Sequence, residues 1–117
     1  MDIKFFNDEI GLISSFSDLY YATASKTEFN SIEEFKDAFI YKQPISLNSK
    51  EIINFPLTPH SFCERRSAII SGVEERVQPV FEHDIHKALL LADEWNTQCI
   101  LAELDEMYVG YLWETGV

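Results

Sequence analysis

Two apolar segments near the C-terminus, 99–104 and 107–115, constrain the fold of this chain more than any other feature. Both are rich in β-branched and aromatic residues, which favour strands, and only Asp105 and Glu106 separate them. They therefore predict an antiparallel hairpin with a turn at these two acidic residues. If these two residues are the turn, the cross-strand neighbours are Leu104 with Met107, Ala102 with Val109 and Ile100 with Tyr111. Asp-Glu fits a two-residue type I′ turn poorly, so a longer loop with another register is the alternative.

The two faces of this hairpin differ in character. The face that holds the cross-strand neighbours is almost wholly apolar, whereas the other mixes Leu101, Tyr108 and Leu112 with Glu103 and Glu114. Such alternation is typical of a strand pair that is covered on one side only. We therefore expect the second face to be partly exposed, with Tyr108 as its best exposed aromatic side chain.

Two further segments predict helices. Ser31 and Glu34 form a capping box ahead of an apolar stripe, and Pro44 ends this helix near Lys42. Asp84 can cap a second helix, which runs to about Trp95 and carries the apolar side chains Ile85, Ala88, Leu89 and Ala92 on one side.

The remaining periodicity is ambiguous. Residues 3–6 predict a first strand, and the stretch after them fits either a helix that carries Ile10, Ile13, Phe16 and Tyr20 or a strand over 19–23. In the middle of the chain we expect a short helix near 49–54 and a strand near 67–71. The 117 residues thus predict a single α+β domain, residues 1–117, whose antiparallel sheet ends in the C-terminal hairpin and is covered by three or four helices.

The formal net charge of −11 limits what this domain can bind. It disfavours nucleic acid and anionic membranes as partners, and no apolar run approaches the roughly 18 residues that span a bilayer. Residues 1–9 lack the basic region and the apolar core of a secretory signal, and the chain has only two cysteines, Cys63 and Cys99. We therefore expect a mature cytoplasmic protein that begins at Met1.

The charge is also unevenly placed. Residues 1–76 hold twelve acidic and eight basic side chains, whereas residues 77–117 hold eight acidic side chains and a single base, Lys87. An ordinary solvated surface accounts for this asymmetry as well as a binding surface does. On the second interpretation the predicted contact patch for a basic protein consists of Glu103, Asp105, Glu106 and Tyr108 with Asp93 and Glu94.

Signals for chemistry are few. His83 and His86 have a spacing that could place two imidazoles near one metal ion, but a structural zinc site needs four ligands. Cys99 falls in an expected strand and is most simply a core residue, and nothing pairs Cys63 with a histidine. The four glycines are too far apart for a phosphate-binding loop. We therefore predict no catalytic residue, no cofactor and no metal.

In its size, charge and overall pattern the chain resembles the small acidic immunity proteins that bacteria pair with toxin domains. This resemblance implies a noncatalytic antagonist that binds and neutralises a basic toxin domain, such as a nuclease. Two alternatives stay open. One is a phage-type inhibitor that mimics DNA, and the other is a ligand-binding or enzymatic α+β domain with a pocket lined by Tyr and Trp.

Overall fold

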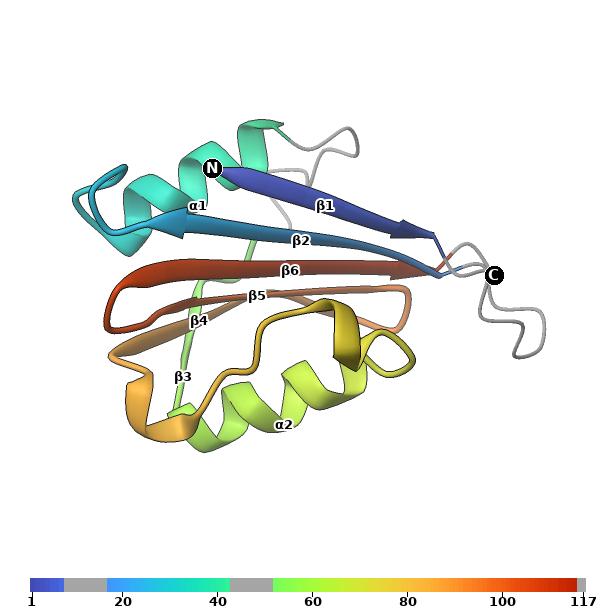
Figure 1. Ribbon diagram of the computed structural model, residues 1–117. Coiled ribbons are helices and arrows are strands. Elements are labelled where there is room, and N and C mark those ends of the chain that lie inside the picture. Colours follow the sequence, from blue (N-terminus) through green and yellow to red (C-terminus); the bar gives the residue numbers. More distant parts are fainter. Residues whose placement is uncertain (8–16, 43–51, 116–117) are drawn as a thin grey trace.

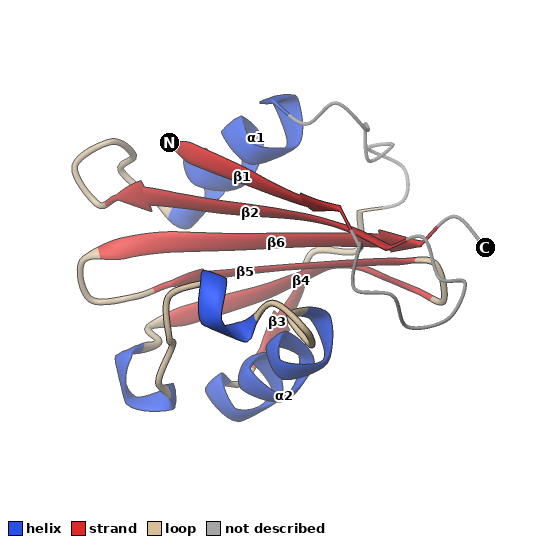
Figure 2. Ribbon diagram, turned by 45° about the vertical axis from the view of Figure 1, so that its right-hand side comes forward, coloured by secondary structure: helices blue, strands red, loops and turns tan. Residues whose placement is uncertain are grey.

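A computed structural model describes residues 1–7, 17–42 and 52–115 (Figure 1). Its centre is a six-stranded, fully antiparallel sheet in the order β1-β2-β6-β5-β4-β3. One helix lies on each side of this sheet (Figure 2). The strands are β1 (Asp2–Asn7), β2 (Ser17–Ser25), β3 (Phe55–Leu57), β4 (Lys87–Glu94), β5 (Thr97–Glu103) and β6 (Met107–Thr115), and the helices are α1 (Ile32–Lys42) and α2 (Pro59–Ile69).

The helix predicted from Asp84 to about Trp95 is wrong: the short 3-10 helix η3 (Glu82–Asp84) ends at Asp84, and strand β4 occupies most of the segment. The two cores, one on each side of the sheet, explain this error. In β4, Leu90 joins the core beneath α2 while Leu89 and Leu91 join the core beneath α1. A strand that is buried on both faces is a continuous apolar run, which periodicity alone cannot distinguish from a buried helix.

The C-terminal hairpin is confirmed, including its register. Ala102 pairs with Val109 and Ile100 with Tyr111, and the N–H of Leu104 donates a 2.8 Å hydrogen bond to the carbonyl of Met107. On its second face Glu103 and Glu114 are partly exposed, as expected, but the apolar side chains are not. Because α1 covers this face, Leu101 and Leu112 are fully buried and Tyr108 is only 2% exposed, so the expectation of an exposed Tyr108 is wrong.

The helix predicted after Ser31 is also confirmed. The hydroxyl of Ser31 accepts a 3.2 Å hydrogen bond from the N–H of Glu34, and Ile32, Phe35 and Phe39 are buried against the sheet. Gly110 permits this close approach. A Cβ atom at that position would lie 2.8 Å from Leu101 Cδ2 and 3.3 Å from the ring of Phe39.

The middle of the chain differs from its prediction. The strand expected near 67–71 is wrong, since α2 extends to Ile69. Thr58 caps this helix by accepting a 3.1 Å hydrogen bond from the N–H of Ser61, and Pro59 stands at its first position. Of the helix expected near 49–54, residues 52–54 are not helical and the rest lies outside the described residues.

At the N-terminus, residues 3–6 lie in β1 and the strand alternative for 19–23 is confirmed as part of β2. The competing helix falls mostly on residues 8–16, outside the described part. The α+β class and the antiparallel sheet are therefore confirmed, but two α-helices, rather than three or four, cover the sheet in the described ranges. Neither of these helices has the length and apolar character needed to cross a membrane.

Candidate functional site

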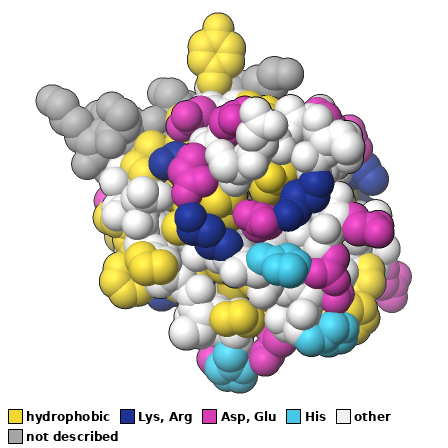
Figure 3. Space-filling model, turned by 90° about the vertical axis from the view of Figure 1, so that its left-hand side faces the viewer, with side chains coloured by type: hydrophobic (Ala, Val, Ile, Leu, Met, Phe, Trp, Pro, Cys, Tyr) yellow, Lys and Arg dark blue, Asp and Glu magenta, His cyan; other side chains and the backbone are white. Residues whose placement is uncertain are grey.

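The turn between β5 and β6 lies at one end of the molecule, and carboxylates from several elements gather around it (Figure 3). They come from the start of β1, the loop after β2, the first turn of α1, η3, the end of β5 and the turn itself. We call this surface the tip face. Its carboxylates are Asp2, Glu28, Glu33, Glu82, Asp84, Glu103, Asp105 and Glu106.

Asp105 connects the turn to the segment before β4. Its Oδ1 forms an ion pair with Nε2 of His86, whose backbone N–H donates a 2.8 Å hydrogen bond to the carbonyl of Glu103. The hydrogen bond with His86 holds the pKa of the Asp105 carboxyl below its ordinary value, and His83 and Asp84 also border this carboxyl group. The turn is therefore tied to both β4 and η3.

All three histidines of the chain lie at this end, among acidic side chains (Figure 3). His60, in the first turn of α2, contacts Glu82 through Nδ1 at 2.8 Å and Glu64 through Nε2 at 2.9 Å. The hydrogen bond to Glu82 is the main reason that the pKa of His60 is raised. Protonation of His60 adds positive charge to the tip face, so the net charge of this surface depends on pH.

Two lysines neutralise part of the tip face. Lys26 Nζ lies 2.7 Å from Glu103 Oε2 and sits over the ring of Tyr108, and Lys87 Nζ lies 2.7 Å from Glu33 Oε1. Glu103 is therefore engaged within the domain. By contrast, no described residue forms an ion pair or side-chain hydrogen bond with Asp2 or Glu106, and both side chains are exposed.

Tyr108 is buried beneath the tip face. Its ring stacks on Phe35 with centroids 5.4 Å apart, and its hydroxyl donates a 3.3 Å hydrogen bond to the carbonyl of Phe29. Tyr108 therefore anchors the loop between β2 and α1. It offers no area for contact with another protein.

The structure does not bring the predicted patch together. Asp93 and Glu94 lie at the end of β4 that pairs with Thr97 and Gln98, whereas Glu103 closes the opposite end of β5. The seven residues of β5 separate these groups by about 20 Å, more than twice the Debye length at physiological salt. Asp93 is moreover paired with Arg65 at 3.2 Å. The six residues of the predicted contact patch therefore do not form one continuous surface.

The residues considered for chemistry have other environments. Among the described residues, no three His, Cys, Asp or Glu side chains come together as ligands for a metal ion. Cys99 is fully buried in β5, as expected for a core residue, and burial raises its pKa. Burial also raises the pKa of Cys63, which makes its thiol less reactive.

Several tip-face residues were missed from sequence, namely Asp2, Glu28, Glu33, Glu82 and Asp84. No local pattern marks them as a group, because they reach the turn only through sheet pairing and helix placement. The pairing of β1 with β2, which brings Asp2 opposite Thr23, is one such long-range contact.

Comparison with known proteins gives no relative: no protein-family model, curated protein or solved structure matches this chain.

Proposed function

We propose that this domain is a noncatalytic antagonist of another protein, of the immunity type, which binds a basic toxin domain through the tip face. The observation that carries the proposal is the convergence of eight carboxylates at one end of the sheet. Only Glu33 and Glu103 among them are paired with lysines in the described structure. A surface of this kind attracts a basic partner over several ångströms and accelerates its association.

Three residues of the predicted patch belong to this surface, and their roles differ: Glu103, Asp105 and Glu106. Asp105 and Glu106 are exposed at the turn and are suited to direct contact. Glu103, paired with Lys26, contributes to the shape of the surface more than to its charge. Tyr108, Asp93 and Glu94 are not part of the proposed interface.

A mimic of DNA is a weaker interpretation of the same surface. Such an inhibitor presents carboxylates in a regular row that stands in for phosphates, whereas here Lys26, Lys87 and three histidines interrupt the acidic side chains. Competition by duplex DNA for the bound partner separates the two: an immunity-type complex with a toxin that is not a nuclease resists it.

The proposal is tested with purified basic toxin domains, together with any basic domain that is encoded next to this chain's gene. We expect a 1:1 complex by size-exclusion chromatography, inhibition of the toxin, and weaker binding at high salt by calorimetry. Asp105→Lys/Glu106→Lys should weaken binding about tenfold or more, since like charges facing each other in an interface cost several kcal/mol.

Glu75→Lys/Glu94→Lys is the matched control, because it makes the same change in net charge at exposed positions away from the turn. It should change the affinity for the partner by no more than about twofold. That small change reflects the weaker long-range attraction between the two proteins. Equal weakening by both double variants would show that only net charge matters and would overturn the tip face as the interface. Failure to bind or inhibit any basic domain would overturn the antagonist proposal itself.

A further inference from the structure

A small pocket of about 120 Å³ lies at the sheet edge formed by β1 and β2, beside the segment that follows α2. Pockets for drug-sized ligands measure about 300–1,000 Å³, so this one suits a small ion or a single chemical group. Its lining residues all have polar side chains: Asp2, Lys4, Tyr21, Thr23, Arg76 and Gln78.

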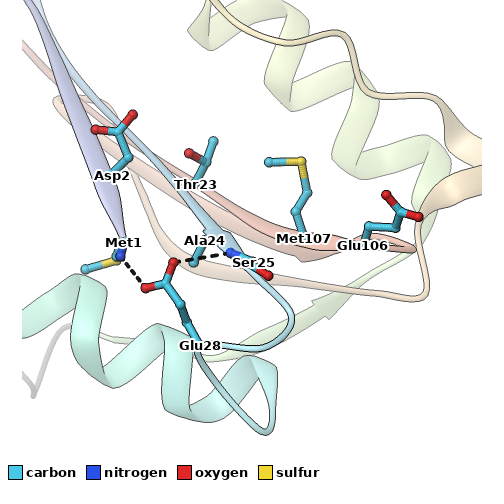
Figure 4. Close-up of a pocket in the computed structure, with 8 residues that line it drawn as sticks. All are labelled: Met1, Asp2, Thr23, Ala24, Ser25, Glu28, Glu106 and Met107. Atoms are coloured by element: carbon cyan, nitrogen blue, oxygen red, sulfur yellow. Dashed lines mark hydrogen bonds and ion pairs between the residues drawn. The ribbon is translucent and has the colours of Figure 1, made fainter.

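The strand pairing brings four of these side chains together. Lys4 and Tyr21 are directly opposite each other in β1 and β2, as are Asp2 and Thr23. Positions two residues apart share one face of a strand, so all four side chains lie on the same side of the sheet. Figure 4, which draws a neighbouring hollow with some of the same residues, shows Asp2 and Thr23 on that common side. It is the side on which α2 lies, because Tyr21 belongs to the core beneath that helix.

The hydroxyl of Tyr21 links the strands to the far wall of the pocket. Its oxygen accepts a 3.3 Å hydrogen bond from the N–H of Gln78. This residue follows the short 3-10 helix η2 (Glu74–Arg76), whose last residue also lines the pocket. Lys4 in the strand wall and Arg76 in the far wall thus border one small pocket, with the Tyr21 hydroxyl where the two walls meet.

The same hydroxyl has a proton to donate. Tyr21 is 3% exposed, and none of the residues that the structure describes accepts a hydrogen bond from its O–H. Buried tyrosine hydroxyls ordinarily find such an acceptor. A ligand oxygen in the pocket would complete the hydrogen bonding of this buried group.

The pocket also holds two cationic groups. Neither Lys4 nor Arg76 forms an ion pair or a side-chain hydrogen bond within the described ranges, although the chain has twenty acidic side chains. The pocket contains one carboxylate, that of Asp2. Two cations and one carboxylate leave a local excess of positive charge in a strongly negative domain. This excess and the free O–H both favour an anion that accepts hydrogen bonds.

We propose that this pocket binds a small oxyanion, a carboxylate or a phosphate group, between Lys4 and Arg76. Both cations bind such oxygens through charge-assisted hydrogen bonds, and the O–H of Tyr21 donates to the same ligand. Asp2 repels the ligand and limits its affinity. The inference goes beyond the proposed function and does not depend on it, because the domain alone forms the site.

The test is a titration of 15N-labelled protein with sodium phosphate, sodium acetate or sodium chloride, each at matched ionic strength and pH 7. We expect saturable shifts of the backbone N–H signals of Thr23 and Gln78 with phosphate or acetate, and no saturation with chloride. The oxyanion that saturates at the lower concentration identifies the group that the pocket prefers. Equal responses to all three salts would overturn the proposal.

Lys4→Gln/Arg76→Gln should weaken oxyanion binding about tenfold or more, because it removes both charged donors. Lys36→Gln/Lys87→Gln is the matched control, since it makes the same change in net charge outside the pocket. It should leave the dissociation constant within about twofold, because salt screens distant charges. Arg76→Gln, a single change at an exposed position, serves if the double variant does not fold. Full binding by the variants that lack Arg76 would overturn the site.

Two further variants test the neighbours of the bound anion. Tyr21→Phe should weaken binding about threefold to tenfold, because it keeps the ring and removes one hydrogen bond to the anion. Tyr41→Phe, at a side chain that is 87% exposed, should have no effect. Asp2→Asn should strengthen binding at least about twofold, since it removes a repelling charge. Undiminished binding by Tyr21→Phe, or weaker binding by Asp2→Asn, would contradict the proposed arrangement of the site.

Discussion

The Nε atom of Arg66 donates a 2.8 Å hydrogen bond to the phenolic oxygen of Tyr111. The same guanidinium donates from Nη2 to the carbonyl of Gln78 at 2.6 Å, and the N–H of Gln78 donates to the hydroxyl of Tyr21 at 3.3 Å. The two tyrosine rings stack with centroids 5.2 Å apart. One arginine of α2 thereby joins the helix to the central strands and to the irregular segment that precedes η3.

Removal of the Tyr111 hydroxyl tests this network. Tyr111→Phe keeps the buried ring but leaves Nε of Arg66 without its acceptor. We expect a loss of about 1 kcal/mol in the free energy of unfolding, measured by urea denaturation. Tyr41→Phe, at a side chain that is 87% exposed, is the control and should change nothing. A Tyr111→Phe variant as stable as the original would show that the bond contributes no net stability.

The same tyrosine predicts a loss of stability at alkaline pH. Burial raises the pKa of Tyr111 to about 12, from an ordinary value of 10.0. Between these values the unfolded chain gives up the phenolic proton while the folded chain retains it, so the free energy of unfolding falls as pH rises. The decrease from this group alone reaches roughly 3 kcal/mol at most. Thermal denaturation between pH 9 and pH 12 measures it, and Tyr111→Phe should show a shallower decline. An identical decline in both proteins would rule out Tyr111 as its source.

The strands β4, β5 and β6 are all buried on both faces, so alternation identifies none of them. The hairpin was predictable because β5 and β6 contain β-branched and aromatic residues on either side of the turn at Asp105 and Glu106. By contrast, β4 is rich in alanine and leucine, which favour helices, and this composition led to the wrong prediction. The coverage of Tyr108 by α1 could not be predicted either, since it depends on which face of the sheet a helix 70 residues away occupies.

The residues of the tip face could also be predicted only in part from the sequence. Its turn residues, Asp105 and Glu106, were predicted from sequence because they follow directly from the hairpin. Asp93 and Glu94 were added because acidic side chains near the ends of the expected helix were expected to join those of the turn in one patch. As part of an extended strand they lie at the far end of the sheet instead. The acidic residues that do reach the turn come from elements whose placement is a long-range property of the fold.

The surroundings of Gly110 leave no space for a side chain in the core beneath α1. Gly110→Ala places a Cβ atom 2.8 Å from Leu101 Cδ2 within a fully buried environment, so we expect a destabilisation of about 1–3 kcal/mol in urea denaturation. Leu101→Val removes the clashing atom. The double variant should therefore be more stable than the sum of the two single effects predicts. Strict additivity would show that the clash is not the origin of the loss.

The two cysteines should differ in reactivity. Cys99 is fully buried, whereas Cys63 is half-buried on α2, and burial raises the pKa of both thiols. With Ellman's reagent in native buffer we expect one slowly reacting thiol per chain, and the second only on unfolding in urea. The variant Cys63→Ser should show no reaction until it unfolds. Rapid native reaction of two thiols would contradict the burial of Cys99 in β5.

His60 gives a prediction for the pH response of the tip face. Its contacts with Glu82 and Glu64 raise its pKa above the ordinary value of 6.5, so its contribution to stability is complete below pH 6.5 and is lost as pH rises through the higher, folded value. Titration of the imidazole Cε1 proton by NMR measures this directly. Glu82→Gln should lower the pKa of His60 toward 6.5, because it removes the larger of the two causes, and Glu64→Gln should lower it less. Since protonation of His60 reduces the negative charge of the tip face, binding of a basic partner should also weaken as pH falls through the raised pKa of His60. An unshifted pKa for His60, or one that Glu82→Gln does not change, would show that the contact between His60 and Glu82 does not form in solution.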